Sequence, residues 1–194
     1  MPRKADEGLE GRILKAAYEL WSKKGEAALT MRAVARAAKT TTPTVYQRFR
    51  NKQDILEGMR RQAMQNFLAA LEPARSSVKT CERFLDFASA HPNDYRLLTA
   101  DWAVRLSRDE RKPSFELIKQ RLADELGGLP ERHTRLALGL GELLHGTATM
   151  LLAEGVNERV ARELRDASMT ACEELIEYAA AKPGAKKATS NPAN

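Results

Sequence analysis

The chain has 194 residues, of which 43% are hydrophobic and 30% charged, and its formal net charge is +6. It contains no run of eighteen apolar residues, which excludes a membrane-spanning helix, and its charged first residues lack the apolar core of a signal peptide. Cys81 and Cys172 are too few for a disulfide framework, so we expect small buried side chains rather than a redox switch, in a cytoplasmic protein.

The chain opens with a charged stretch and an amphipathic helix. Residues 1–8 predict a flexible basic arm, in which Arg3 and Lys4 either reach an adjacent minor groove or are simply solvated. Residues 9–24 predict the first helix, which Gly25 ends. Its apolar residues recur at helical spacing and are Ile13, Ala16, Ala17, Leu20 and Trp21. We expect this helix to support the segment that follows.

Two short helices come next, joined by about three residues. The first spans residues 31–38, with apolar side chains on one face and Thr30 as its N-cap candidate. The second spans residues 42–48, with Thr41 or Thr42 as its cap and Pro43 in the first turn, where no N–H is needed. Two helices of this length and spacing predict a helix-turn-helix.

The second of these helices has few apolar positions. Val45 and Phe49 are one turn apart and face inward, and most other positions carry groups that hydrogen-bond phosphates and base edges. The pattern is typical of a recognition helix in a DNA major groove, and an ordinary solvent-facing helix is the alternative. The candidate DNA-binding residues are Thr30, Thr41, Thr42, Pro43, Thr44, Tyr46, Gln47, Arg48 and Lys52.

Charge is divided unevenly along the chain. Residues 1–62 contain 14 Lys and Arg against 7 Asp and Glu, a net +7, whereas residues 63–194 contain 18 against 19, a net −1. A basic domain that also carries a recognition-helix pattern is the charge distribution expected for DNA binding.

The stretch from Gly11 to Met59 resembles the N-terminal DNA-binding domain of the TetR family of bacterial transcriptional regulators. The matching positions are Ile13-Leu14-Lys15-Ala16-Ala17, Gly25, Thr30, Val34, Ala35, Ala38, Tyr46, Phe49, Lys52, Asp54, Ile55 and Leu56. The resemblance implies that Tyr46 and Lys52 contact phosphates. Lys39 departs from the family pattern, because the family usually has Gly at this turn.

The rest of the chain predicts helices only, and the fold class is therefore all-α. A fourth helix runs from residue 52 or 53 to residue 72, and Pro73 ends it. The later helices are separated by Pro and Gly breakers and span residues 78–90, 94–107, 114–126, 131–153 and 157–180. This organisation predicts a DNA-binding domain at 9–60, a second helical domain at 61–181 and a disordered tail at 182–194. The second domain resembles the C-terminal domain of TetR regulators, and the resemblance implies that it binds a ligand and dimerises.

The last two helices carry wide apolar stripes, which can face a core on one side and a partner on the other. The family resemblance implies a four-helix interface in a homodimer, and a purely internal role is the alternative. The candidate interface residues are Leu140, Leu144, Leu151, Leu164, Ala171 and Leu175. A C2 dimer would match a palindromic operator.

The same domain is expected to bind a small-molecule effector of unknown identity. Aromatic and Met side chains with polar tips are typical of apolar pockets, and equally of cores. The candidates are Phe84, Phe87, Tyr95, Leu98, Trp102, Phe115, His145 and Met150. No cofactor and no metal are expected, because the motifs and ligand spacings of enzymes are missing from the sequence.

The sequence favours a sequence-specific transcriptional regulator, most simply a repressor that a ligand releases from DNA. An interaction module with the same fold but without DNA binding is the alternative. Operator sequence, regulated genes and the choice between repressor and activator are not encoded in these patterns.

Overall fold

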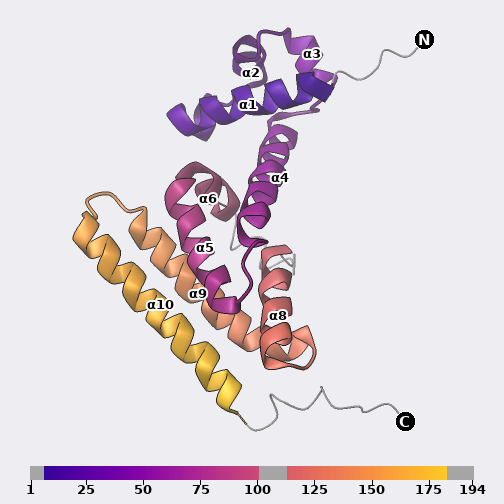
Figure 1. Cartoon of the computed structure of the whole chain (residues 1–194). Coiled ribbons are helices and arrows are strands. Elements are labelled where there is room, and N and C mark those ends of the chain that lie inside the picture. The colour runs from indigo at the N-terminus through magenta and orange to yellow at the C-terminus, as the bar shows by residue number, and fades with distance from the viewer. Residues whose placement is uncertain (1–6, 101–112, 183–194) are drawn as a thin grey trace, which may run out of the picture. The chain divides into compact units, whose positions relative to one another are not determined.

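The computed structural model describes residues 7–100 and 113–182, and within these ranges every regular element is helical (Figure 1). The predicted all-α class is confirmed. The helices in chain order are α1 (Glu7–Lys24), η1 (Glu26–Ala28), α2 (Met31–Ala37), α3 (Thr42–Tyr46), α4 (Lys52–Leu71), α5 (Ser77–Ala90), α6 (Pro92–Thr99), α8 (Pro113–Leu126), η2 (Pro130–His133), α9 (Thr134–Leu151) and α10 (Glu158–Ala181).

The chain divides into two compact units, Met1–Met64 and Gln65–Asn194. Helix α4 begins in the first unit and ends in the second. The sequence placed the boundary between residues 60 and 61, inside the same helix. Arg3, Lys4, Trp102 and the end of the helix expected at 94–107 lie outside the described residues.

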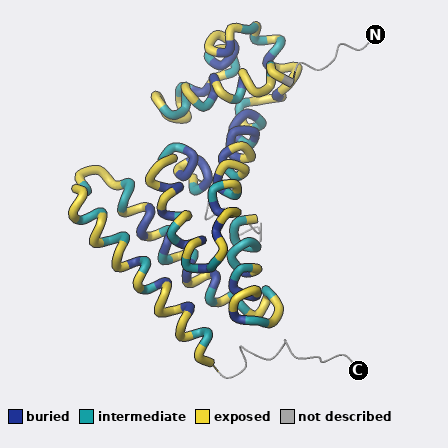
Figure 2. Tube along the Cα trace, in the orientation of Figure 1, coloured by how far each residue is buried: buried dark blue, intermediate teal, exposed yellow. Residues whose placement is uncertain are grey.

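The first unit is a small helical domain with one apolar core. Helix α2 packs against both α1 and α3. Helices α1 and α4 approach closely at Gly58, because a Cβ atom there would lie 2.8 Å from Cδ2 of Leu14. The buried side chains come from all four helices and their connections, as Figure 2 shows in dark blue, and include Ile13, Ala17, Leu29, Val34, Ala35, Val45, Phe49, Ile55 and Leu56.

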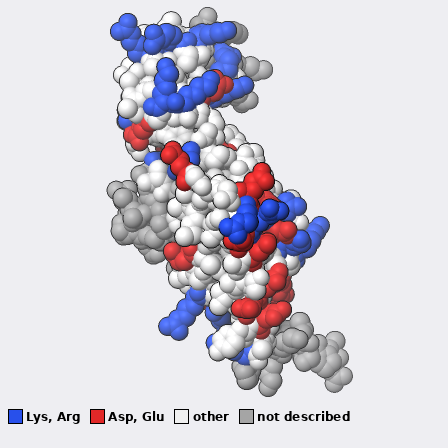
Figure 3. All heavy atoms as spheres, turned by 90° about the vertical axis from the view of Figure 1, so that its left-hand side faces the viewer, with Lys and Arg blue, Asp and Glu red and all other residues white. Residues whose placement is uncertain are grey.

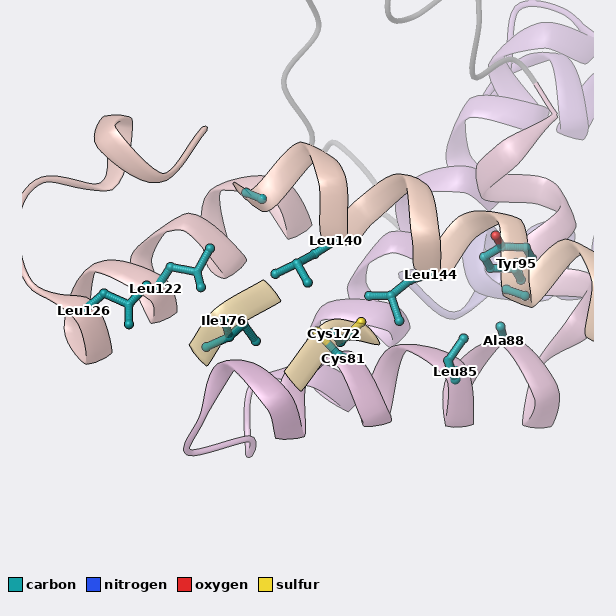
Figure 4. Close-up of a cluster of buried hydrophobic side chains, with 12 residues drawn as sticks. Cys81, Leu85, Ala88, Tyr95, Leu122, Leu126, Leu140, Leu144, Cys172 and Ile176 are labelled. Carbon is teal, nitrogen blue, oxygen red and sulfur yellow. The ribbon is translucent and has the colours of Figure 1, made fainter. Parts of the chain in front are cut away.

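The second unit is a bundle in which α5 packs on α6, α8, α9 and α10, and α9 also contacts α8 and α10. Figure 4 shows its core side chains between these helices, among them Leu85 of α5, Leu122 of α8, Leu140 of α9 and Ile176 of α10. Each of these side chains is less than a tenth exposed. Burial of this apolar surface is the main force that holds the long helices together.

Cys81 of α5 and Cys172 of α10 are free, fully buried thiols that lie beside each other in this core (Figure 4). A hydrogen bond between the two thiols raises the pKa of Cys81, and burial raises it further. The expectation that both cysteines are small buried residues is confirmed.

Helix ends in the second unit follow local sequence signals. Ser76 caps α5 by accepting a hydrogen bond from the Lys79 N–H at 3.1 Å, and Asn157 caps α10 by accepting one from the Val160 N–H at 3.0 Å. The helix expected at 131–153 is split, because its first turn is the 3₁₀ helix η2 and α9 begins only at Thr134. Among the described residues, no helix is both long and apolar enough to span a bilayer.

Candidate nucleic-acid interface

Helix α2 is fixed at both ends by hydrogen bonds. The Thr30 hydroxyl accepts a hydrogen bond from the Ala33 N–H at 3.1 Å, as its N-cap position predicts. At the other end, the N–H of Thr40 donates to the Ala35 carbonyl at 2.9 Å and the N–H of Lys39 donates to the Arg36 carbonyl at 3.2 Å. This pair of bonds is a Schellman motif, which sets the direction of the chain toward α3.

Lys39 occupies the left-handed position of that motif, with φ of 53°. A residue with a Cβ atom costs roughly 1–2 kcal/mol in this conformation, and Gly is the usual occupant because it avoids that cost. Lys39 is the one non-glycine residue in the described ranges with positive φ. The departure from the family pattern therefore keeps the turn geometry and adds backbone strain.

Helix α3 is capped by Thr41, which settles the choice between Thr41 and Thr42. The Thr41 hydroxyl accepts a hydrogen bond from the Thr44 N–H at 3.3 Å and lies 2.7 Å from the Thr44 hydroxyl. The helix ends at Tyr46, two residues earlier than expected, and Gln47 continues in αR conformation as its C-cap. Hydrogen bonds from Gln47 N–H to the Pro43 carbonyl and from Phe49 N–H to the Val45 carbonyl keep the last turn compact.

The two sides of α3 differ sharply. Val45 is fully buried and Phe49 is only 3% exposed, so these two side chains anchor the helix in the core as expected. On the other side, Tyr46 is 53% exposed, and Gln47 and Arg48 are also exposed. The remaining candidates are accessible as well: Thr30, Thr41 and Pro43 are exposed, and Thr42, Thr44 and Lys52 are half-buried. The structure thus brings the candidate residues of α3 onto one accessible surface.

Two cations near α3 are held by carboxylates. The Lys52 ammonium lies 2.8 Å from Oε1 of Glu26 in η1. Arg50 binds Asp54 through two guanidinium hydrogen bonds of 2.7 and 3.0 Å, and its backbone N–H also donates to the same carboxylate. The hydrogen bond from Arg50 lowers the pKa of Asp54 below its ordinary value. Sequence spacing did not reveal that Lys52 is paired, because Glu26 is 26 residues away.

The segment from residue 27 to residue 53 contains six Lys and Arg and no Asp or Glu. It covers α2, the turn and α3. Figure 3 shows Lys and Arg gathered on the face of the first unit that it displays, with little Asp or Glu among them, whereas Asp and Glu are prominent on the second unit. A segment that carries hydroxyl, amide and cationic groups and no carboxylate of its own can hydrogen-bond a polyanion with little like-charge repulsion.

Comparison with protein families identifies two matches. Residues 13–59 match the model for bacterial regulatory proteins of the tetR family, and residues 77–175 match the model for the tetracyclin repressor-like C-terminal domain. The chain belongs to the TetR family. The resemblance inferred from the residues of the helix-turn-helix is thereby confirmed, and it extends to the second unit.

Solved structures show the same fold. A TetR-like transcriptional regulator from Rhodococcus sp. RHA1 is 22% identical, with a TM-score of 0.59 over 93% of this chain and 100% of that one. A TetR regulator from Streptomyces coelicolor is 22% identical, with a TM-score of 0.63 over 89% of this chain and 97% of that one. Another TetR-family transcriptional regulator from the same organism is 20% identical, with a TM-score of 0.62 over 86% of this chain and 99% of that one. Comparison with curated protein sequences gives no match.

In this TetR-family chain, most of the expected pocket residues lie in the packed interior of the second unit. The Tyr95 hydroxyl is 2.5 Å from Nδ1 of His145, and burial raises the pKa of Tyr95 to about 12. The rings of Phe84 and Phe87 both contact Phe67, and Phe84 also meets Tyr95 edge to face. Leu98 is buried, and Phe115 packs against the core.

Met150 is the exception among those candidates. It is 56% exposed, so it does not lie in the packed interior with the others, and its place in a ligand pocket stays a prediction. The second unit has a cavity of about 680 Å³ elsewhere, lined by Leu68, Glu72, Pro113, Glu116, Leu117, Gln120, Pro130 and Glu131. Its lining includes none of the expected pocket residues, so their role in ligand binding stays a prediction. No group of His, Cys, Asp or Glu within the described ranges is arranged to hold a metal ion.

Two of the residues predicted at the dimer interface lie in the core of the single chain. Leu140 and Leu144 are 1% and 4% exposed within a single chain, so their assignment to a dimer interface is wrong. They fill the core against α5 and α10 instead. Leu151, Leu164 and Ala171 are half-buried, and Leu175 is 40% exposed.

The large apolar side chains that α9 and α10 expose are Leu138, Met150, Leu175 and Tyr178. Of these, Leu175 is the one that was expected at the interface. Gly139 and Gly146 lie on the open side of α9, where an added Cβ atom would meet no atom within 4 Å. The sequence analysis missed this surface because it assigned α9 by its leucines, although Arg135, Glu142 and Thr149 recur at seven-residue spacing and mark the exposed side.

Proposed function

We propose that this TetR-family chain is a homodimeric, sequence-specific DNA-binding repressor that a small molecule releases from its operator. The observation that carries the proposal is α3, which is anchored by Val45 and Phe49 and exposes polar side chains within a segment free of carboxylates. Polar groups on a short exposed helix of a basic unit are suited to the DNA major groove.

Each exposed group of α3 has a role in this proposal. Thr42, Thr44 and Gln47 face base edges, and Pro43 offers apolar contact to a thymine methyl. Thr41 holds the first turn through its cap, which positions the residues that follow. These contacts read sequence only if α3 is held at a fixed angle, which the buried anchors and the Schellman turn provide.

Phosphate contacts complete the interface. Thr30, Tyr46, Arg48 and Lys52 bind backbone phosphates and set the register of α3 on the duplex. Lys52 must exchange its bond with Glu26 for one with a phosphate. The side chains of Lys52 and Glu26 are about half exposed, at 43% and 56%, so the exchange costs little.

Dimerisation supplies the second recognition helix. The apolar surface of α9 and α10, made by Leu138, Met150, Leu175 and Tyr178, fits the same surface of a second copy in an isologous C2 contact. Exposed glycines on α9 let the partner helix approach closely. Two copies of α3 related by C2 symmetry would match a palindromic operator.

Release by an effector follows from a population shift. A ligand that binds the second unit more tightly in a conformation unsuited to DNA lowers operator affinity by its differential binding energy. Helix α4 belongs to both units and contains no Pro or linker, so it can transmit such a shift.

A gel-shift titration with the DNA upstream of the chain's own gene tests the proposal. The wild-type chain should give a specific, salt-sensitive complex, and the double variant Tyr46→Ala/Gln47→Ala should bind at least about a hundredfold more weakly. Gln65→Ala, which removes an exposed amide in the second unit, is the matched control and should bind normally. All variants should keep the dimer mass in sedimentation.

Two other outcomes of this experiment would favour a different function. If the wild-type chain remains dimeric but forms no specific complex with any duplex, a non-DNA-binding interaction module is the better description. If a specific complex forms and raises transcription from a reporter, the chain is an activator. Small molecules that dissociate the complex would identify the effector.

A further inference from the structure

We infer that Lys39, at the turn between α2 and α3, contacts a DNA phosphate beside the recognition helix; the inference rests on the proposed function. It adds a residue to the interface that neither the helix-turn-helix pattern nor the family resemblance assigned. Three observations support it: the strained backbone of Lys39, the exposure of its side chain and the absence of an ion pair.

The backbone conformation at this position does not require a lysine. The Schellman bonds of Thr40 and Lys39 require a residue with positive φ, and Lys39 adopts φ of 53° to make them. Glycine meets that requirement without strain, and asparagine meets it with less strain than lysine. A residue kept in a strained conformation at an exposed turn points to a role for its side chain outside the fold.

The position of Lys39 indicates which group its side chain would contact. It is two residues ahead of Thr41, the N-cap of α3, and so lies next to the first turn that carries Thr42 and Pro43. A helix end that enters a major groove passes close to the phosphates at the groove edge. The long, flexible side chain of a lysine presents a point charge that suits a phosphate better than a specific base.

The charge of Lys39 is available for such a contact. Its side chain is exposed, and among the described residues no carboxylate pairs with it. The neighbouring cations Arg50 and Lys52 are both bound to carboxylates in the free chain. Lys39 can therefore bind a phosphate without first breaking an ion pair.

Variants at this position separate charge from backbone conformation. Lys39→Asn removes the charge but tolerates positive φ, Lys39→Arg keeps the charge, and Lys39→Gly removes both the charge and the strain. Lys24→Asn is the matched control, because Lys24 is an exposed lysine at the end of α1, outside the carboxylate-free segment. Operator affinity is measured by fluorescence anisotropy across a salt series, and Tm by calorimetry.

The inference predicts that Lys39→Asn binds the operator about tenfold more weakly at 0.1 M salt. The slope of log K against log salt should become shallower by about 1.8, because the dimer loses two phosphate contacts. Lys39→Arg and Lys24→Asn should bind like the wild type. Lys39→Gly should bind as weakly as Lys39→Asn while its Tm rises by about 3 °C.

Unchanged affinity and salt slope in Lys39→Asn would overturn the inference while leaving the proposed function intact. A fall in Tm for Lys39→Gly would also overturn it, because Lys39 would then stabilise the end of α2 rather than serve DNA. Failure of the wild-type chain to bind any duplex would instead refute the proposed function, and these outcomes are distinguishable in one set of measurements.

Discussion

The two units expose different kinds of side chain. On α3 of the first unit the accessible residues are hydroxyl, amide, phenol and guanidinium groups, and the apolar residues Val45 and Phe49 are buried. On α9 and α10 of the second unit, Leu138, Met150, Leu175 and Tyr178 are exposed. Under the proposed function, the first set of side chains would contact DNA and the second would contact a second copy of the chain.

The difference between the two units depends most on which side chains of α9 are buried in the core of a single chain. Leu140→Ala should lower the free energy of unfolding by about 2–5 kcal/mol, because it leaves a cavity among fully buried side chains. Leu138→Ala, on the exposed side of the same helix, is the control and should change intrinsic stability far less. Urea unfolding at several protein concentrations separates stability from association. Equal effects of the two variants would contradict the assignment of Leu140 to the core.

The exposed apolar surface should respond to charge more than to loss of volume. Met150→Glu should weaken dimerisation by about a hundredfold, because it buries a carboxylate in the interface. Met150→Leu should leave the dimer intact. Sedimentation velocity over a concentration series measures the dissociation constant. A Met150→Glu chain that dimerises normally would show that this surface has another use.

On the DNA-binding side, Thr41→Ala should destabilise α3 by about 1 kcal/mol, because the Thr44 N–H loses its hydrogen-bond acceptor. Thr41→Ser keeps an acceptor and should restore most of the loss. Hydrogen exchange of the α3 amides reports the change locally. If exchange is the same in all three chains, the cap does not hold the helix.

The ion pair after α3 should give the smallest effect, and it depends on pH. The hydrogen bond from Arg50 lowers the folded-state pKa of Asp54. The ion pair therefore stabilises the fold at pH values above the unfolded pKa of 3.8. This stabilisation is lost as pH falls through the folded-state pKa. Asp54→Asn should therefore have a lower free energy of unfolding than the wild type in urea at pH 7. The difference should be smaller near pH 3. A difference that does not depend on pH would exclude this cause.

Local spacing was sufficient to predict the first unit. The caps Thr30 and Thr41, the anchors Val45 and Phe49, and the turn at Lys39 are each defined by neighbours within about five residues. Most helix ends in the second unit were predicted to within two residues, because Pro, Gly and capping residues mark them, but the 3₁₀ turn η2 before α9 was not predicted. These signals act over a single turn of chain and do not depend on the rest of the fold.

The partners of residues distant in sequence were not predictable. Leu140 and Leu144 were expected at an interface but are core, and Met150 was expected in a pocket but is exposed. The many leucines of α9 concealed the weaker signal of its exposed side, which Arg135, Glu142 and Thr149 mark. The Lys52–Glu26 pair likewise joins elements whose proximity depends on tertiary packing.

Selection of bound sequences from random duplex DNA by the full-length chain tests the central claim most directly. The account predicts enrichment of an inverted repeat whose half-sites are centred roughly 34 Å apart, one helical turn. It further predicts that the enrichment is lost with Tyr46→Ala/Gln47→Ala. No enriched sequence, or the same sequence enriched by the double variant, would contradict the claim that α3 reads DNA.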